Sequence, residues 1–365
     1  MNEKSQGMVL EQFNHPLQLR AIEIPPLQSG QILARITAAG ICGSDVHMWT
    51  GKDPRTPLPM ILGHEGVGEV VRIGGRRYTV DGTDLKEGQA ILWNRGVVCG
   101  TCYWCRRAGQ PELCPNRWVY GIHRSCEVSP YLNGCYSEYV ILDAKTDVFL
   151  PEDPDVDPAV LVPASCSGAT VAHAFDLCPP DKGDIVLVQG PGPLGIFAVA
   201  FAKEFGASEI AVIGGTPERL EICRSFGATT ILNRNELSTE ERRQAVMALT
   251  DGRGVDLAIE AVGQPEVFRE GIDLVRRGGA YISVGVGAPA GTIELDLYQD
   301  IELKNLRLQG VWVSHSKHTR MAMDLILKHG NLFQRMITHR LDLKDATGAL
   351  EIVRARKSIK AVLIP

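Results

Sequence analysis

The stretch DIVLVQGPGPLGIFAVAFAKEFG, residues 184–206, decides the fold of this chain. It begins as an apolar strand, continues through a turn with the spacing GxGxxG, and ends as an apolar helix. Glycines in such a turn allow the close approach of a pyrophosphate, and the start of the helix offers free N–H groups and the positive end of a dipole. The alternative is a strand–helix turn that uses glycine for its geometry alone. The dinucleotide site is favoured because further strand–helix units follow.

The predicted nucleotide-binding residues of this turn are Gly190, Gly192, Pro193, Leu194 and Gly195. Proline lacks an N–H group, so the turn must rely on its glycines and on the helix start to bind phosphate. The units that follow are EIAVI with PERLEICRSFG, TTIL with STEERRQAVMALT, DLAIE with PEVFREGIDLVRRG, and a last strand AYISVGV. Strands that alternate with helices predict a doubly wound parallel sheet, a Rossmann domain of the α/β class.

The end of the second strand of this domain departs from the usual NAD pattern. An NAD site normally has Asp or Glu there to hold the ribose hydroxyls. This chain has Gly214, Gly215 and Thr216, with Arg219 one turn into the next helix. Without the carboxylate, repulsion of a 2′-phosphate is missing and Arg219 can attract it, so NADP is allowed. The alternative is a solvated Arg219 and an NAD site that uses backbone contacts.

The first part of the chain, to about Asp143, predicts a β-rich domain. Its short β-branched runs are QILARITAAG, GEVVRIGG, QAILWN and SEYVILD, separated by turns. The proline-rich and acidic segment 151–163 suits an exposed connection. A helix at 320–330 and a strand at 359–365 are expected to pack back on the first domain. The predicted domains are therefore 1–165 with 315–365, and 166–314.

Four cysteines, Cys99, Cys102, Cys105 and Cys114, form the strongest local signal in the chain. Their spacing is typical of a structural Zn²⁺, which four thiolates bind tetrahedrally without leaving a position open for chemistry. We therefore expect a zinc lobe at about 97–116 that shapes the protein and takes no part in catalysis. The alternatives are a disulfide pair or four unrelated buried cysteines. A redox role for Cys126 and Cys135 is open, although free buried thiols are favoured.

Composition argues for a globular protein and excludes several classes. With 365 residues, 44% of them hydrophobic, the chain can bury a sizeable core. A net charge of -5 offers no basic footprint for nucleic acid. The start MNEKSQGMVLEQFNHP has no apolar signal region, and no apolar run reaches the length of a membrane span. We therefore expect a cytoplasmic protein that binds neither nucleic acid nor membrane.

Three other segments carry groups that can bind a metal: GICGSDVH at 40–47, GHEGVG at 63–68 and PASCSGAT at 163–170. No single segment is specific for a metal site, because such a cysteine is more often simply buried and such a histidine is more often hydrogen-bonded within the core. Together with the four-cysteine lobe and QGPGPLG, however, they stand in the order found in zinc-dependent medium-chain alcohol and polyol dehydrogenases. The sequence resembles that family over nearly its whole length.

The resemblance implies a groES-like catalytic domain, a Rossmann domain, a catalytic Zn²⁺ in the cleft, and a homodimer or homotetramer. It further implies the site residues, with two zinc ions per chain. The catalytic Zn²⁺ would be bound by Cys42, His64 and Cys166, and Glu65 would transiently replace the water on the metal. Asp45 would orient His64, and Ser44 and His47 would relay the proton. In the cofactor site, Thr170 would contact the nicotinamide and Lys360 would contact the pyrophosphate.

Two departures from the family pattern stand out. The last gap of the four-cysteine lobe is one residue longer than the commonest spacing, and Gly43 replaces a basic residue that some members aim at the pyrophosphate. The chemistry itself follows from the ligand set. Three protein ligands leave one position of Zn²⁺ open for a substrate hydroxyl, which becomes acidic there.

The sequence thus predicts a zinc-dependent oxidoreductase that interconverts an alcohol and its aldehyde or ketone with NAD or NADP. Two alternatives stay open at this point. One is a zinc-free quinone or enoyl reductase on the same fold, which would not need Cys42, His64 and Cys166. The other is a zinc- and nucleotide-binding sensor or structural protein with little turnover, which would not need the relay of Ser44 and His47. The sequence does not reveal the substrate.

Overall fold

The computed structural model describes residues 3–153 and 155–365. The chain divides into two compact units, Met1–Ala169 with Ser314–Pro365, and Thr170–Val313. The predicted boundary lay a few residues earlier, at 165/166. The first unit continues past the helix α3 (Pro158–Leu161) and the 3₁₀ turn η2 (Val162–Ser165), which pack against its strands, and ends at Ala169. Cys166 therefore belongs to the same unit as Cys42 and His64.

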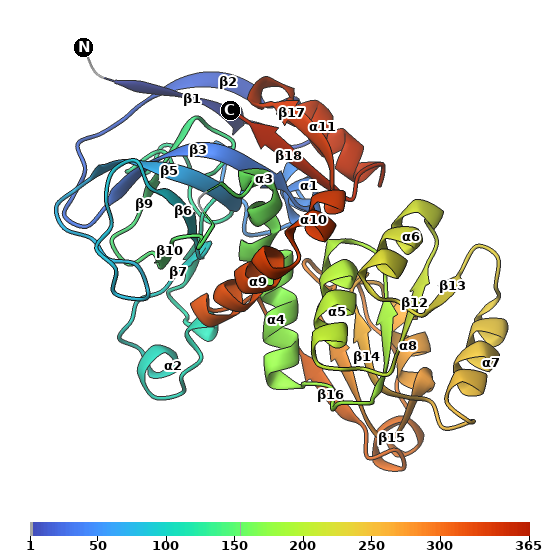
Figure 1. Ribbon diagram of the computed structural model, residues 1–365. Helices are drawn as coiled ribbons and strands as arrows, with labels where there is room; N and C mark the ends of the chain where they lie inside the picture. The colour runs from blue at the N-terminus through green and yellow to red at the C-terminus, as the bar shows by residue number, and fades with distance from the viewer. Residues whose placement is uncertain (1–2, 154) are drawn as a thin grey trace. The chain divides into compact units, whose positions relative to one another are not determined.

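The first unit is built around a seven-stranded sheet with the order β10-β6-β5-β3-β18-β17, to which β9 adds by pairing with β3 (Figure 1). The strands are β3 (Ile32–Ile41), β5 (Glu65–Ile73), β6 (Ala90–Trp93), β9 (Tyr139–Leu142), β10 (Val148–Phe149), β17 (Ile337–Asp342) and β18 (Lys360–Ile364). The four runs predicted as strands before Asp143 are strands of this sheet. The C-terminal strand β18 pairs with β3, as the sequence suggested.

Smaller elements complete the first unit. A three-stranded sheet contains β1 (Lys4–Leu10), β2 (Gln18–Glu23) and β4 (Met60–Ile61), and a two-stranded one contains β7 (Gly96–Val97) and β8 (Trp118–Val119). The helices are α1 (Gly43–Trp49), α2 (Tyr103–Arg106), α9 (Ser316–Lys328), α10 (Gly330–Phe333) and α11 (Ala346–Arg354), with short turns η1 (Pro111–Leu113), η4 (Gln334–Met336) and η5 (Leu343–Asp345). Apolar side chains of β1, β3, β5 and β9 fill the core of this unit.

The second unit is the predicted doubly wound domain. Its six strands have the order β13-β12-β11-β14-β15-β16, and every adjacent pair is parallel. They are β11 (Ile185–Gln189), β12 (Glu209–Gly214), β13 (Thr230–Asn233), β14 (Val255–Glu260), β15 (Val275–Ser283) and β16 (Arg307–Gly310). This order, 3-2-1-4-5-6 within the unit, is that of a dinucleotide-binding Rossmann fold.

Helices complete the second unit, and the first of them begins at the end of the first unit. They are α4 (Ser167–Leu177), α5 (Pro193–Glu204), α6 (Pro217–Phe226), α7 (Thr239–Leu249) and α8 (Pro265–Leu274), with a π-helical turn η3 (Leu297–Glu302). One prediction needs correction, and one strand was not predicted. The helix at 265–278 ends at Leu274, because β15 begins at Val275 and pairs with β14. The edge strand β16 was not predicted, because its residues do not alternate between buried apolar and exposed polar side chains, the pattern that indicates a strand.

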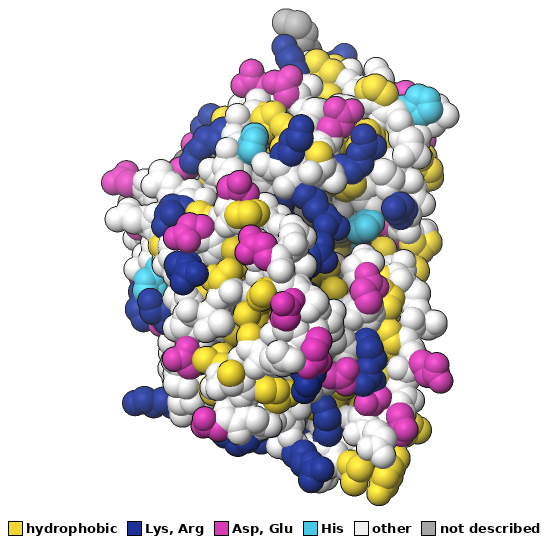
Figure 2. Space-filling view, turned by 90° about the vertical axis from the view of Figure 1, so that its right-hand side faces the viewer, with side chains coloured by type: hydrophobic (Ala, Val, Ile, Leu, Met, Phe, Trp, Pro, Cys, Tyr) yellow, Lys and Arg dark blue, Asp and Glu magenta, His cyan; other side chains and the backbone are white. Residues whose placement is uncertain are grey.

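No single helix within 3–153 and 155–365 is long and apolar enough to cross a membrane, although the bent pair 158–165 and 167–177 would pass by length and composition. On the face seen in Figure 2, basic and acidic side chains are interspersed rather than separated by sign. Cys126 and Cys135 are buried free thiols, and burial raises the pKa of both. These two residues form no disulfide.

Candidate active site

The structure brings the four cysteines of the lobe together. The Sγ atoms of Cys99, Cys102, Cys105 and Cys114 all lie within 4.8 Å of one another. Cys102 and Cys105 are 3.5 Å apart at sulfur, as are Cys99 and Cys114. Tetrahedral ligation with Zn–S bonds of about 2.3 Å requires sulfur separations of this order. The longer last gap is taken up by the turn η1, so all four sulfurs still converge.

A second group of metal-binding side chains lies in the same unit. Cys42, His64, Glu65 and Cys166 each direct one ligand atom to a common point, with all four atoms within 4.8 Å of one another. Cys42 caps α1 directly after β3, His64 precedes β5, and Cys166 follows the turn η2. The antiparallel pairing of β3 with β5 brings the first two segments together. Close packing of the segments needs Gly40, where a Cβ would lie 2.3 Å from Glu65 Oε2.

Asp45 fixes the orientation of His64. Its Oδ1 is 3.0 Å from His64 Nδ1, and its Oδ2 accepts hydrogen bonds from the Cys42 amide and the Tyr136 hydroxyl. Burial alone would lower the pKa of His64, but the charge and hydrogen bond of Asp45, together with the hydrogen bond and charge of Cys42, raise this pKa to about 9. With Nδ1 bound to Asp45, Nε2 faces Cys166, at 3.4 Å from Sγ. A ring held in this way presents Nε2 to a metal.

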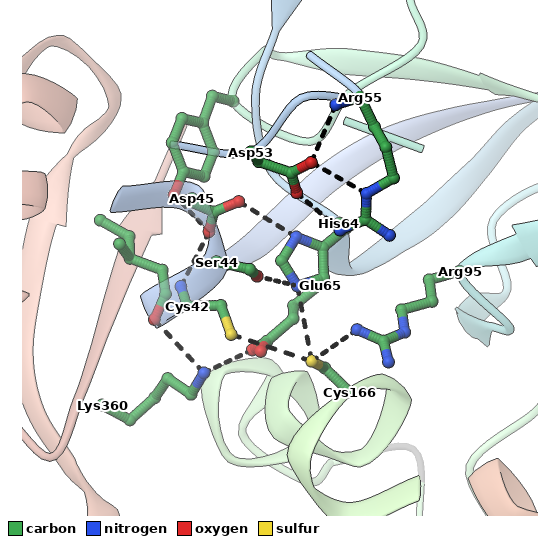
Figure 3. Close-up of polar contacts among 12 residues, drawn as sticks. Cys42, Ser44, Asp45, Asp53, Arg55, His64, Glu65, Arg95, Cys166 and Lys360 are labelled. Atoms are coloured by element: carbon green, nitrogen blue, oxygen red, sulfur yellow. Dashed lines mark hydrogen bonds and ion pairs between the residues drawn. The ribbon is translucent and has the colours of Figure 1, made fainter. Parts of the chain in front are cut away.

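The two cysteines of this group behave as a coupled pair. Their sulfur atoms are 3.9 Å apart, and the hydrogen bond from Cys166 lowers the pKa of Cys42 well below its ordinary value (Figure 3). Arg95 donates from Nη1 to Cys166 Sγ at 2.6 Å. Arg95 was not predicted from the sequence, where it appears only as an isolated cation after a strand. The site thus favours a thiolate at the position of the predicted ligands.

Glu65 and Lys360 form a buried ion pair beside the metal-binding group. Lys360 Nζ is 2.6 Å from Glu65 Oε2 and 3.3 Å from the carbonyl oxygen of Ile41. The side chains are 0% and 1% exposed for Glu65 and Lys360. Oε1 of Glu65 is buried and has no hydrogen-bond partner among the described residues. A buried acceptor without a donor next to two sulfurs and an imidazole suits a cation at this point. The family resemblance implies that Lys360 contacts the pyrophosphate of the cofactor. The ion pair of Lys360 with Glu65 was not predicted from the sequence.

The predicted relay residues both lie on α1. Ser44 Oγ is 3.4 Å from His64 Nε2, and the half-buried His47 follows in the last turn of the same helix. Thr170 is buried on α4, at the start of the second unit. Ser44 is therefore adjacent to the metal-binding group, and His47 lies about one helical turn further along α1.

The glycine-rich turn requires glycine at two positions. Gly190 has φ +105, in the region that favours glycine. A Cβ at Gly195 would lie 1.7 Å from the carbonyl oxygen of Gly190, so only glycine permits the helix to start so close to the turn. Gly192 caps α5, and a Cβ there would meet nothing within 4 Å. Pro193 and Leu194 are the first two residues of that helix, whose first N–H groups have no acceptor within the helix.

The end of β12 carries the residues predicted to select the cofactor. A Cβ at Gly214 would lie 2.5 Å from the ring of Pro191, so no side chain fits at that position without displacing the glycine-rich turn. At Gly215 the nearest atom is Nε of Arg234, at 2.9 Å from such a Cβ. Thr216 caps α6, which holds Arg219. Arg234 is thus a second cation at this point, and it could not be predicted from the sequence because it lies beyond the next strand.

Comparison with known proteins agrees with this description. Residues 28–152 match the model of the alcohol dehydrogenase GroES-like domain, and residues 193–328 match that of zinc-binding dehydrogenases. The chain is 32% identical to 5-exo-hydroxycamphor dehydrogenase of Pseudomonas putida, over 92% of this chain and 91% of that one. It is 30% identical to L-threonine 3-dehydrogenase of Escherichia coli strain K12, over 94% of each chain.

Solved structures give the same result. An alcohol dehydrogenase from Thermotoga maritima shares 47% identity with a TM-score of 0.96, and the match covers 100% of both chains. A zinc-binding dehydrogenase from Sinorhizobium meliloti, bound to NADP, shares 27% identity with a TM-score of 0.86, again over 100% of both chains.

The chain belongs to the zinc-dependent alcohol dehydrogenase family, with a GroES-like domain and a Rossmann domain. It is an oxidoreductase that interconverts an alcohol and its carbonyl compound with NAD(P). The predicted fold class and enzyme class are both confirmed. A sensor or structural protein with little turnover is not supported, because the relatives named above are dehydrogenases.

Proposed function

We propose that Cys42, His64 and Cys166 bind the catalytic zinc of this dehydrogenase, and that Glu65 lies beside it. The observation that carries this proposal is the convergence of four ligand atoms within 4.8 Å at a buried point. The orphaned Oε1 of Glu65 adds a second, independent reason. When bound, zinc supplies a Lewis acid that favours loss of the hydroxyl proton of the substrate, and NAD(P) accepts the hydride.

The residues of the chain perform the steps around this chemistry. Asp45 holds His64 in the tautomer that can bind metal through Nε2. Ser44 lies next to that nitrogen and receives the hydroxyl proton. His47, on the same helix, passes the proton toward solvent. Arg95 and Lys360 place positive charge beside Cys166 and Glu65, which are both buried.

We further propose that Cys99, Cys102, Cys105 and Cys114 bind a structural zinc. Support comes from their sulfur separations and from Thr101, whose amide donates to Cys99 and helps lower the pKa of that thiol to about 5. A thiolate at neutral pH is the form that binds zinc. The lobe then stabilises the first unit and takes no part in the reaction.

One experiment tests both zinc assignments. Metal analysis of the purified protein should give two zinc ions per chain. Cys42→Ala should retain one zinc and lose turnover with a small change in melting temperature. Cys102→Ala should retain the other zinc and lose thermal stability first. One zinc or none in the unmodified protein prepared with excess metal would contradict the assignment, as would equal stability losses in the two variants.

For the cofactor, we propose that Gly190, Gly192, Pro193, Leu194 and Gly195 bind the pyrophosphate. The residues Gly214, Gly215 and Thr216 border the adenosine ribose, with Arg219 and Arg234 available to a 2′-phosphate. Thr170 touches the nicotinamide. Support comes from the open helix start at Gly192 and from the missing carboxylate at the end of β12. The relative from Sinorhizobium meliloti that binds NADP is consistent with this.

We propose that the enzyme works in the cytoplasm as a homodimer or homotetramer and binds neither nucleic acid nor membrane. All ten cysteines are free, which suits a reducing compartment. The edge strand β16 leaves Leu308 exposed, and Trp312, Leu297 and Tyr298 are exposed nearby in the sequence. An open edge with apolar neighbours suits a second copy of the chain. Light scattering of the purified protein would measure the oligomeric state.

A further inference from the structure

A buried carboxylate lies at the point of the Rossmann sheet where the strand order reverses, entirely within the second unit. It belongs to Glu260, the last residue of β14, which is 0% exposed. Glu260 pairs in register with Gln189, the last residue of the neighbouring strand β11. A dinucleotide binds outside the carboxyl ends of the strands at such a point. Glu260 therefore lies at the edge of the sheet that carries the proposed cofactor site, and the mechanism above does not use it.

The carboxylate of Glu260 accepts hydrogen bonds from two separate segments. The amides of Val262 and Gly263, which follow β14, both donate to Oε1, the second of them at 2.5 Å. The amide of Gly285, which follows β15, also donates to this carboxylate, and the hydroxyl of Ser283 lies 3.5 Å from Oε2. Burial raises the pKa of Glu260, and these four donors oppose the rise. One side chain thus joins the loops that leave β14 and β15 at the carboxyl end of the sheet.

The two loops are in backbone contact around this carboxylate. A Cβ at Gly285 would lie 2.4 Å from the amide nitrogen of Gly263 and 2.7 Å from Glu260 Oε1. A Cβ at Gly263, which has φ +80, would lie 2.4 Å from the carbonyl oxygen of Gly285. Because backbone meets backbone here, the position of one loop fixes the position of the other. Buried amides in such a contact need an acceptor, and Glu260 provides it.

The loop after β14 also touches the glycine-rich turn. The Ala261 amide donates to the carbonyl oxygen of Gln189 at 2.9 Å. A Cβ at Gly190 would lie 2.7 Å from Cγ2 of Val262 and 3.2 Å from the carbonyl oxygen of Ala261. The segment that Glu260 holds is therefore packed against the turn proposed to bind the pyrophosphate.

The Rossmann fold assigns the two loops to one half of the cofactor. Each half of such a sheet binds one mononucleotide. The adenosine ribose is proposed to lie at the end of β12, in the half formed by β11, β12 and β13. The loops after β14 and β15 belong to the other half, which is left for the nicotinamide mononucleotide.

We propose that Glu260 is a positioning residue for the nicotinamide half of the cofactor. It acts through the backbone of the two loops. Its carboxylate holds the segment 261–263 and Gly285 in one arrangement before the cofactor arrives, so that binding does not have to order them. Loss of the carboxylate frees three amides and this arrangement with them, while the end of β12 is untouched. The inference rests on the proposed nucleotide site and adds to it a residue that acts through its neighbours.

The test separates the two halves of the cofactor. Binding to the zinc-loaded protein is measured by calorimetry with NADH or NADPH, whichever binds more tightly, and with ADP-ribose or its 2′-phosphate, which lack nicotinamide. Glu260→Gln keeps the side-chain volume but replaces the charged acceptor with a neutral amide that has one acceptor oxygen. We expect it to weaken binding of the complete cofactor about tenfold or more, the effect of losing hydrogen bonds to a charged group. The ADP-ribose ligand should bind the variant within about twofold of the unmodified protein.

Asp256→Asn is the matched control. Asp256 lies near the amino end of β14, where it accepts hydrogen bonds from the Ile185 amide at 2.7 Å and from Nε of Arg276 at 2.5 Å. This variant should lose thermal stability and leave both affinities unchanged. Equal weakening of the two ligands in Glu260→Gln would show that Glu260 only stabilises the fold, and this result or unchanged binding of both would refute the inference. An unmodified protein that binds neither ligand would instead count against the proposed nucleotide site.

Fluorescence of the bound reduced cofactor gives an independent measurement. The emission of the nicotinamide ring depends on its surroundings, so a ring held less firmly should emit more nearly as it does in free cofactor. We expect this change in Glu260→Gln and not in Asp256→Asn, each at saturating cofactor. If Glu260→Gln does not fold, Glu260→Asp takes its place, because the shorter side chain keeps the charge but cannot reach all of the donors. An emission spectrum identical to that of the unmodified protein in the variant that folds would refute the proposal.

Discussion

Replacing Asp45 with Asn should release the catalytic zinc by forcing the wrong tautomer on His64. Asp45 Oδ2 accepts from two donors, the Cys42 amide and the Tyr136 hydroxyl, and Oδ1 accepts from His64 Nδ1. An asparagine has one oxygen, and two donors require it at the Oδ2 position. Its NH₂ group then faces His64 Nδ1, which must become an acceptor, so the ring proton moves to Nε2. A protonated Nε2 cannot bind zinc.

The expected loss follows from the role of this one contact. Outer hydrogen-bond partners of metal-binding histidines typically contribute about 10- to 100-fold in metal affinity, which is roughly 1.4–2.7 kcal/mol. The carboxylate of Asp45 is fully buried, so solvent does not weaken this effect. Zinc affinity is measured by competition with a chromogenic chelator. Asp45→Asn should lose one zinc at chelator concentrations at which the unmodified protein retains two.

The chain supplies its own controls. The four-cysteine lobe is an internal reference, because its zinc should be released at the same chelator concentration in both proteins. Tyr136→Phe removes one donor to Asp45 and leaves the acceptor for His64, so its zinc affinity should change little. An Asp45→Asn protein that folds, keeps both zinc ions and binds them as tightly as the unmodified protein would refute the tautomer argument.

Three further outcomes are expected. Lys360→Met leaves the buried carboxylate of Glu65 unpaired and should lower the free energy of unfolding by about 3–5 kcal/mol, which is measured as a fall in melting temperature. The double variant Lys360→Met with Glu65→Gln should largely restore the melting temperature, and an equal or larger fall in the double variant would contradict this. His123 has a pKa of about 4 in the folded protein, below its ordinary value, so the unfolded chain takes up more protons as pH falls below about 6.5 and the folded protein loses stability. Between pH 7 and 5 the free energy of unfolding, measured by calorimetry, should fall less in His123→Gln than in the unmodified protein. An identical fall would show that His123 does not contribute. Gly215→Asp should shift the ratio of kcat/KM values toward NAD by about tenfold, because its carboxylate repels a 2′-phosphate and binds ribose hydroxyls, and an unchanged ratio would separate this residue from the ribose.

Much of the fold could be predicted because its signals are local. The strand, the glycine-rich turn and the helix at 184–206 follow one another in the sequence, and so do the four cysteines of the lobe. Each of these features is complete within a short segment, and its spacing alone limits the structure it can form. The strand β16 escaped prediction because it has no apolar alternation, and its place in the sheet comes only from pairing with β15.

The partners within the site could not be predicted in the same way. Lys360 meets Glu65 only because β18 pairs with β3, which in turn pairs with β5. Arg95 reaches Cys166, 71 positions further along the sequence, only in the folded chain. In the sequence these cations are separated from their partners by long intervals and look like ordinary surface residues. Their pairing depends on sheet register, which no local pattern specified.

The two proposed zinc sites therefore depend on the fold in different ways. The cysteines of the lobe lie within one short segment, and zinc itself can draw them together. Cys42, His64 and Cys166 come from three segments that meet only when β3, β5 and the turn η2 are packed, and this packing depends on Gly40. A Cβ there would lie 2.3 Å from Glu65 Oε2 and 2.4 Å from Val162 Cγ1. Any side chain at Gly40 must push apart the β5 carboxylate and the turn that carries Cys166, so the catalytic site would be disturbed while the lobe kept its ligands.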